Sequence, residues 1–326
     1  MTHQGRSHGI TIRQLQISLG ALWIFDGALQ LQPYMFQKGS NGFLGPISQN
    51  TMGPPNPITD FISYVVRNLV AHQSLATVGI AIVQIGIGVL LIWPKFIKAG
   101  LVLSSVWALG VWVVGEGVGQ LIFPQASMLV GAPGAGLIYS ILGIVLWPRT
   151  APTPNPPDQE DKFSNWIDSG TWAFIIWAVV WCGTALLELE SANWKPNAIP
   201  TQLQTVASEQ PAWFAHIGTW LSRIAAGHGT EIAFALLLIE FIVGWGVLRP
   251  LTRSFSLALG IATSLVLWIV GQGVGGILTG KGTDPNLGPA MVIFALALWI
   301  WPVQPTHDGV ATSNDVSDNS ERILTP

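Results

Sequence analysis

The sequence is poor in charged residues and has almost no cysteine. Lys, Arg, Asp and Glu make up 10% of the 326 residues, whereas soluble domains usually carry about 25%. This deficit argues against an ordinary soluble enzyme. The single cysteine, Cys182, rules out an intrachain disulfide and a thiolate-rich metal site. The net charge of −3 offers no basic surface to nucleic acid.

Hydrophobic residues, by contrast, make up half of the chain, and 16 residues are tryptophan. Tryptophan concentrates where a membrane meets water, and a helix needs roughly 20 mostly apolar residues to cross a bilayer. The candidate spans are 14–36, 73–93, 97–123, 127–147, 171–190, 229–248, 253–278 and 287–302. The sequence therefore predicts an all-α, polytopic membrane protein with eight transmembrane helices.

Eight spans place both termini on one side of the membrane. That side holds nine of the 14 Lys and Arg residues, and such residues accumulate in cytoplasmic loops. We therefore expect cytoplasmic termini and a location in the cell membrane. Residues 151–170 are Pro-rich and then acidic, which predicts a cytoplasmic linker. The polar residues 305–326 are expected to form a disordered tail.

The two halves of the chain are similar to each other. The aligned segments are VQIGIGVLLIWP (83–94) with IEFIVGWGVLRP (239–250), and VWVVGEGVGQLI (111–122) with LWIVGQGVGGIL (267–278). Both pairs are 156 residues apart (239 − 83 and 267 − 111), and the same shift pairs Pro133 with Pro289. We interpret this as a duplication, with residues 1–150 and 171–304 as four-helix repeats. An even number of spans per repeat makes the two copies parallel.

Two further features recur in both halves. The segments FISYVVRNLVAH (61–72) and IGTWLSRIAAGH (217–228) are amphipathic, which predicts short helices at the outer membrane interface. Glycines recur at Gly115, Gly117, Gly119, Gly271, Gly273 and Gly275. Because small residues let helix backbones approach closely in lipid, these glycines predict helix packing.

Acidic residues lie well inside the predicted spans, whereas Lys and Arg occur only at span ends, at Lys98 and Arg253. A charge at the bilayer centre costs roughly 2.5–3.5 kcal/mol. Asp26 and Glu116 are each followed one helical turn later by an amide, Gln30 and Gln120. The first span carries Asp26 and is too long for a signal peptide, so we expect a retained helix. Most polar residues of the spans lie toward their outer ends, which predicts an outward-facing polar pocket between helices. The alternative is that no shared pocket exists, and that each acid is either solvated at the interface or hydrogen-bonded to a neighbouring helix.

The aligned halves differ at these polar positions. The mismatched pairs are Asp26 with Thr184, Gln30 with Glu188, Gln84 with Glu240, and Glu116 with Gln272. Exchanging an acid for an amide lets a site hold one charge instead of two, as an asymmetric ligand site requires. Drift after the duplication explains the same differences.

Histidine and arginine repeat before the second span of each half. His72 and His228 occupy equivalent positions, and two facing histidines would suit a haem. Arg67 and Arg223 would meet its propionates or an anionic substrate. Alternatively, a histidine near a helix start is often only a capping or solvated residue.

A metal site is a second use of the outer polar residues. His228 and Glu231 are three residues apart, and Glu188 lies near the outer end of its span, so the three are candidate metal ligands. Gln120 and Gln272 are candidates for binding a cofactor through their amides.

The four-span unit resembles the DoxX/DoxD family of integral membrane proteins. The resemblance rests on LGALWIFDGALQL (19–31), the outer segment after it, a Gly-rich second span ending in a Pro or basic turn, and a third span closing on Gly-rich sequence. It covers most of residues 14–302 as two fused units. DoxD-like proteins are associated with thiosulfate:quinone oxidoreductase, and other members are accessory membrane proteins or uncharacterised.

Three functions fit these observations, and the sequence leaves open whether the protein is an enzyme. The first is a membrane subunit of a quinone-linked respiratory system. In it Asp26 and Glu116 are the catalytic residues that take up quinol protons, because buried carboxyls suit proton exchange near neutral pH. The second is an accessory subunit that binds other membrane subunits. The third is a transporter of protons or a small solute.

Overall fold

The computed structural model describes residues 9–51, 56–148 and 170–301, and these form helices and connecting turns without a strand. The α-helices are α1 (Ile12–Leu29), α2 (Leu44–Gln49), α3 (Pro57–Val70), α4 (Gln73–Ile92), α5 (Ile97–Val114), α6 (Ala135–Val145), α8 (Thr171–Leu187), α9 (Ala198–Glu209), α10 (Ala212–Ala225), α11 (Gly229–Gly246), α12 (Arg253–Val270) and α13 (Leu287–Trp299). The 3₁₀ helices are η1 (Pro33–Phe36), η2 (Gly39–Asn41), η3 (Pro94–Phe96), η4 (Met128–Val130) and η5 (Gly273–Thr279). The predicted tail, and the predicted linker up to residue 169, lie outside the described residues.

Four helices in the described ranges are long and apolar enough to cross a membrane. They are α4, α5 with η3, α11, and α12 with η5. Many of their apolar side chains are exposed, as expected for a membrane protein that contacts lipid. The other four predicted spans also contain helices, but α6, α8 and α13 are shorter. The count of eight spans therefore stays a prediction.

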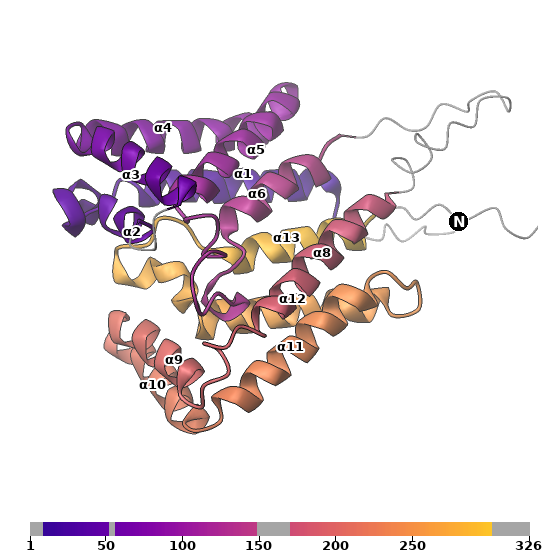
Figure 1. The fold of residues 1–326 in the computed structure, drawn as a ribbon. Coiled ribbons are helices and arrows are strands. Elements are labelled where there is room, and N and C mark those ends of the chain that lie inside the picture. The colour runs from indigo at the N-terminus through magenta and orange to yellow at the C-terminus, as the bar shows by residue number, and fades with distance from the viewer. Residues whose placement is uncertain (1–8, 52–55, 149–169, 302–326) are drawn as a thin grey trace, which may run out of the picture.

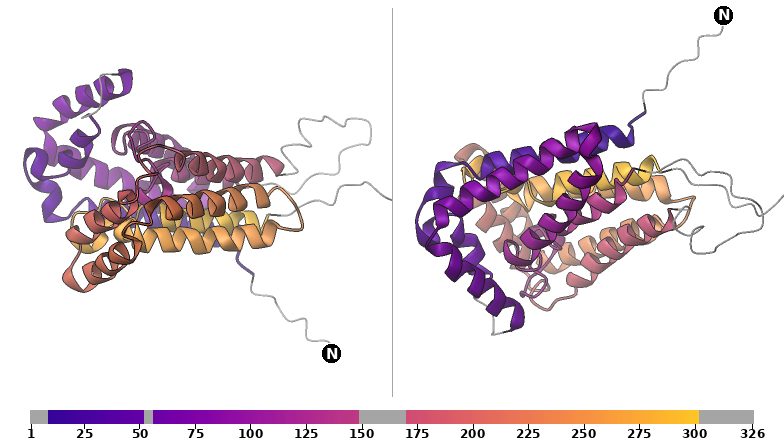
Figure 2. Two further views of the ribbon diagram at one scale, coloured as in Figure 1. Left: turned by 60° about the horizontal axis from the view of Figure 1, so that its bottom comes forward. Right: turned by 90° about the horizontal axis from the view of Figure 1, so that it is seen from above.

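The long helices run alongside one another, and the short helices α2, α3, α9 and α10 gather at one end of them (Figure 1). The turns joining α4 to α5 and α11 to α12 lie at the opposite end (Figure 1), and the helices are seen from two further sides in Figure 2. In the first half α1 packs on α4 and α5 on α6. In the second half α8 packs on α11 and α12 on α13.

The recurring glycines shape the ends of α5 and α12. Residues 117–120 and 273–276 all have positive φ angles, a left-handed backbone that glycine adopts without steric cost. Val118 and Val274, with φ of 58° and 56°, adopt it at a cost of about 1–3 kcal/mol each. The helix-packing prediction is therefore wrong for the glycines of these turns. The two α-helices also end at Val114 and Val270, before the predicted span ends.

Two tryptophans fix the segments that follow these turns. Trp112 Nε1 donates to the Pro133 carbonyl at 2.7 Å, and Trp268 Nε1 donates to the Pro285 carbonyl at 2.5 Å. The equivalent of Pro133 is therefore Pro285, 152 residues away (285 − 133), and not Pro289. The connection after α12 is shorter than the one after α5 by four residues.

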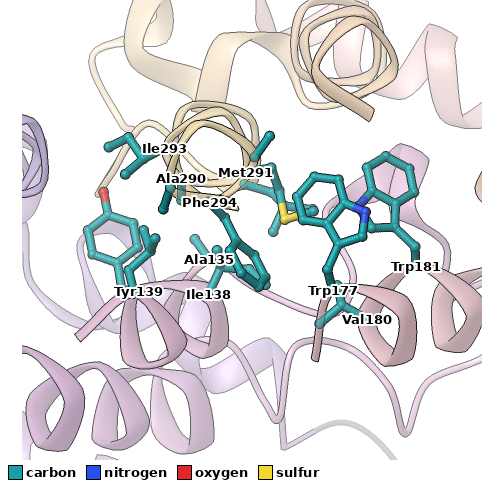
Figure 3. Close-up of a cluster of buried hydrophobic side chains, with 14 of the residues drawn as sticks. Ala135, Ile138, Tyr139, Trp177, Val180, Trp181, Ala290, Met291, Ile293 and Phe294 are labelled. Atoms are coloured by element: carbon teal, nitrogen blue, oxygen red, sulfur yellow. The ribbon is translucent and has the colours of Figure 1, made fainter. Parts of the chain in front are cut away.

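The two halves meet where α6 packs against α13 (Figure 3). Phe294 of α13 points into this contact, and its ring lies edge-on to Trp177 of α8 at 5.2 Å between centroids. Ile138 of α6 is fully buried in the same cluster. The apolar core is continuous across both halves, so neither half encloses it alone.

Helix α1 approaches α4 closely through glycine. A Cβ on Gly88 would lie 2.5 Å from the Gly20 carbonyl oxygen, and a Cβ on Gly244 would lie 2.6 Å from Cys182 Sγ. Gly88 and Gly244 are 156 residues apart (244 − 88). In both halves a missing side chain therefore permits the contact with the first long helix.

We expect Gly88→Ala to lower the free energy of unfolding by about 1–3 kcal/mol, the usual cost of overpacking a close contact. The measurement is thermal unfolding of the purified protein in detergent. Gly79→Ala is the matched control on the same helix, because a Cβ there meets nothing within 4 Å. Equal midpoints for the two variants would refute the close approach.

Candidate functional site

A cavity of about 690 Å³ lies between α1, α4, α5 and α6 of the first half and the segment that precedes α13 in the second half. Its walls are mostly apolar, and this volume is in the range that accommodates a drug-sized ligand. Its polar side chains are Asp26, Gln30, Gln84, Glu116, Tyr139, Thr283 and Asp284. None of the described residues that line it is Lys, Arg or His. The predicted polar pocket thus has a counterpart in the structure that brings Asp26 and Glu116 together.

Asp26 lies on α1 and is 2% exposed. Its Oδ1 atom has no hydrogen-bond partner among the described residues, and the Tyr139 hydroxyl of α6 lies next to the carboxyl. The Tyr139 ring packs edge-on against Trp23 at 5.0 Å, and Trp23 Nε1 donates to Ser104 Oγ at 2.8 Å. The aromatic packing thus holds the tyrosine hydroxyl beside the carboxyl.

Glu116 lies two residues beyond the end of α5 and caps the start of α6. Its Oε1 accepts a hydrogen bond from the Gly136 backbone N–H at 2.9 Å, which satisfies a free donor of the first helical turn. Its Oε2 is buried and has no hydrogen-bond partner among the described residues, and Glu116 is one of the residues that line the cavity. Burial, and secondly the negative charge of Asp284, raise the pKa of Glu116 to about 8. This carboxyl therefore exchanges protons near neutral pH.

Asp284 comes to the cavity from the other half of the chain. It lies before α13, where its Oδ1 accepts from the Asn286 N–H at 2.7 Å and its Oδ2 from the Thr283 hydroxyl at 2.8 Å. Burial raises its pKa, and its charge acts on both Asp26 and Glu116. No sequence pattern pointed to Asp284, because it lies in a connecting segment between predicted spans.

The segment around Asp284 is attached to the first half by further hydrogen bonds. Gln30 Nε2 donates to the Thr283 carbonyl at 3.3 Å, and Gln32 Nε2 donates to the Gly282 carbonyl at 3.0 Å. These two glutamines follow Asp26 on the same part of the chain. These hydrogen bonds hold Thr283 and Asp284 in place as part of the cavity wall.

In return, residues 126–128 of the first half, here called the exchanged segment, contact the second half. Asn193 Nδ2 donates to the Ala126 carbonyl at 3.1 Å, and Gln272 Nε2 donates to the Met128 carbonyl at 3.1 Å. The Ser127 hydroxyl and the Met128 backbone lie next to the Glu188 carboxyl, whose Oε1 has no hydrogen-bond partner among the described residues. The two halves thus exchange the segments that follow their left-handed turns.

A second pair of buried acids lies beside this exchanged segment. Glu240 is fully buried on α11, and both of its carboxyl oxygens lack a partner among the described residues. Its neighbours are the Glu188 carboxyl and the Thr184 hydroxyl. Burial raises the pKa of Glu188, which lies just beyond α8, to about 7. The predicted site residue Glu188 therefore belongs to this cluster and not to the cavity.

The residues predicted to bind haem lie elsewhere. His72 and His228 precede α4 and α11, which lie on opposite sides of the molecule (Figure 1), so they do not face each other. Both histidines are exposed, and so are Arg67 and Arg223. The structure does not bring these four residues together.

The predicted metal ligands are also apart. Glu231 and His228 are exposed whereas Glu188 is buried, and within the described ranges no three His, Cys, Asp or Glu side chains are grouped to hold a metal ion. Gln120 Nε2 donates to Asn50 Oδ1 at 3.1 Å and so ties the turn after α5 to the end of α2. Gln272 contacts the exchanged segment.

We expect Asp284→Asn to lower the pKa of Glu116 from about 8 toward its ordinary value, because a neighbouring negative charge is removed. The measurement is a pH titration of the protonated-carboxyl infrared band, assigned by its loss in Glu116→Gln. Asp60→Asn, at an exposed position of α3, is the control and should leave the titration unchanged. An unshifted titration in Asp284→Asn would show that the two carboxyls do not interact.

Comparison with known proteins gives no relative. No family model, curated protein or solved structure matches the chain. The resemblance to DoxX/DoxD proteins therefore stays a prediction, and the cavity has to be interpreted from its own residues.

Proposed function

We propose that the protein is a membrane subunit of a quinone-linked redox system, and that the cavity binds the head group of a quinone or quinol. The observation that carries this proposal is the cavity's composition, a largely apolar space with carboxyl, amide and phenol groups. A quinone ring is flat and apolar, and it carries oxygen at opposite edges. It therefore matches apolar walls with a few hydrogen-bonding groups.

The chemistry follows from the protonation states of the two partners. A quinol hydroxyl donates a hydrogen bond to an ionised carboxylate, whereas a quinone carbonyl accepts one from a protonated carboxyl or from the Tyr139 hydroxyl. Asp26 and Glu116, in their ionised forms, take up the two protons that quinol loses on oxidation. The two electrons pass to a redox partner subunit, which the chain would bind in the membrane.

The same proposal includes the finer architecture. We propose eight membrane spans in two parallel, DoxX-like four-helix repeats, with cytoplasmic termini in the cell membrane. The identical offset of 156 residues between the starts of α4 and α11 and of α5 and α12 supports the repeats. The position of the α4–α5 and α11–α12 turns at one end, away from the short helices, agrees with the proposed orientation (Figure 1).

We expect Asp26→Asn, and separately Glu116→Gln, to weaken quinol binding about 10- to 100-fold, the usual loss for a hydrogen bond to a charged group. The measurement is equilibrium binding of a decyl-tailed quinol to the full-length protein in lipid nanodiscs, at a pH above the Glu116 pKa of about 8 so that this carboxyl is ionised. Glu240→Gln, in the second acid cluster, is the control and should retain wild-type affinity. Wild-type protein that binds no quinol would exclude this function.

The absence of basic side chains among the described cavity residues favours one alternative. A cavity with three carboxyls and apolar walls also suits a small amphiphilic cation, which a proton-coupled transporter would carry. In that case an imposed proton gradient would drive the cation across the membrane of proteoliposomes that contain the purified protein. A quinone-linked subunit would not move it, and a purely accessory subunit would keep its partners in Asp26→Asn.

A further inference from the structure

The cavity reaches the outer surface between α4 and α5. Val83, Leu103 and Val106 line it, yet they are 37%, 47% and 65% exposed. Both helices are among the four that are long and apolar enough to cross a membrane, so their exposed faces contact hydrocarbon. The opening between α4 and α5 therefore faces lipid.

Two glycines stand at this opening. Gly86 of α4 and Gly110 of α5 line the cavity, and a Cβ at either position would meet nothing within 4 Å. Glycine in a helix interior is about 1 kcal/mol less favourable than alanine, and no neighbouring atom here requires it. Unlike Gly88, these glycines leave free space at the cavity wall.

The second half has large side chains at the same places. With the shift of 156 residues, Gly86 corresponds to Ile242 (242 − 86) and Gly110 to Val266 (266 − 110). Ile242 and Val266 are 47% and 56% exposed, so they face outward. The outer edge between α4 and α5 thus lacks two side chains that the α11–α12 pair carries.

The polar groups of the cavity lie far from the end of this opening where α4 turns into α5. Leu90 and Leu103, near the turn that joins α4 to α5, line its apolar part. Asp26 and Glu116 lie near the C-terminal ends of α1 and α5, at the other end of the cavity from this turn. A ligand that satisfies both parts has a polar head and an apolar extension.

We propose that the opening between α4 and α5 is a lateral portal through which the hydrocarbon tail of the bound ligand extends into the bilayer. This inference rests on the proposed quinone-linked function and names its substrate class, a lipid-soluble quinone with a long tail. The head lies at Asp26 and Glu116, and the tail passes Gly86 and Gly110. The ligand enters from the membrane and not from water.

The test uses the full-length protein in nanodiscs and two quinones with the same ring, one with a decyl tail and one without a tail. The double variant Gly86→Ile, Gly110→Val carries the side chains of the second half. We expect it to bind the tailed quinone roughly tenfold more weakly, equivalent to losing the burial of about two methylene groups. Its affinity for the tail-less quinone should stay within about twofold of wild type.

Gly79→Ala is the control, because it adds the side chain of the aligned Ala235 at an open position of α4 outside the cavity lining. It should bind both quinones as wild type does. Wild-type affinity of the double variant for the tailed quinone overturns the portal and leaves the proposed function standing. An equal loss of both quinones also overturns the portal, because the new side chains would then fill the head-group site. Wild-type protein that binds neither quinone overturns both proposals. If the double variant does not fold, the single variant Gly110→Val is judged by the same two affinities.

Discussion

The left-handed turns at the ends of α5 and α12 determine where the polar side chains lie. A right-handed helix that continued through residues 117–120 or 273–276 would carry the following chain further along its own axis. Four consecutive residues with positive φ instead reverse it within one turn. The tryptophan indoles at 112 and 268 then hold the returning segment through its proline carbonyl. Glu116 precedes such a turn, and its carboxyl therefore reaches the start of α6.

The exchange of segments between the halves follows from this reversal. Each turn is followed by a connection that contacts the other half before its own last helix begins. The cavity of the first half thereby acquires Asp284, and Ser127 and Met128 come to lie next to the buried Glu188 carboxyl. The α6–α13 contact lies in the same core. The cavity is consequently a property of the whole chain, because one of its three carboxyls belongs to the opposite half.

The sequence predicted the helical class and the membrane character, since long apolar runs leave few alternatives to a spanning helix. It also predicted that Asp26 and Glu116 share a pocket. It could not place Asp284, because the contact joins segments that are far apart in the chain. The prediction that these glycines pack helices was wrong for a physical reason. Glycines that allow close helix packing and glycines that allow a positive φ angle recur in the same way in a sequence. The pairing of His72 with His228 failed because equivalent positions of two repeats need not face each other.

The acid-to-amide difference between Glu116 and Gln272 has a local cause that the sequence did not reveal. Gly134 precedes α6 and has no side chain to cap it, so Glu116 accepts the hydrogen bond from Gly136. The equivalent residue before α13 is Asn286, whose own side chain accepts from the Leu287 N–H at 2.7 Å. Gln272, which matches Glu116, is then free to bind the exchanged segment at Met128. One capping residue thus decides which half needs a carboxyl at this position, and that carboxyl belongs to a residue that lines the cavity.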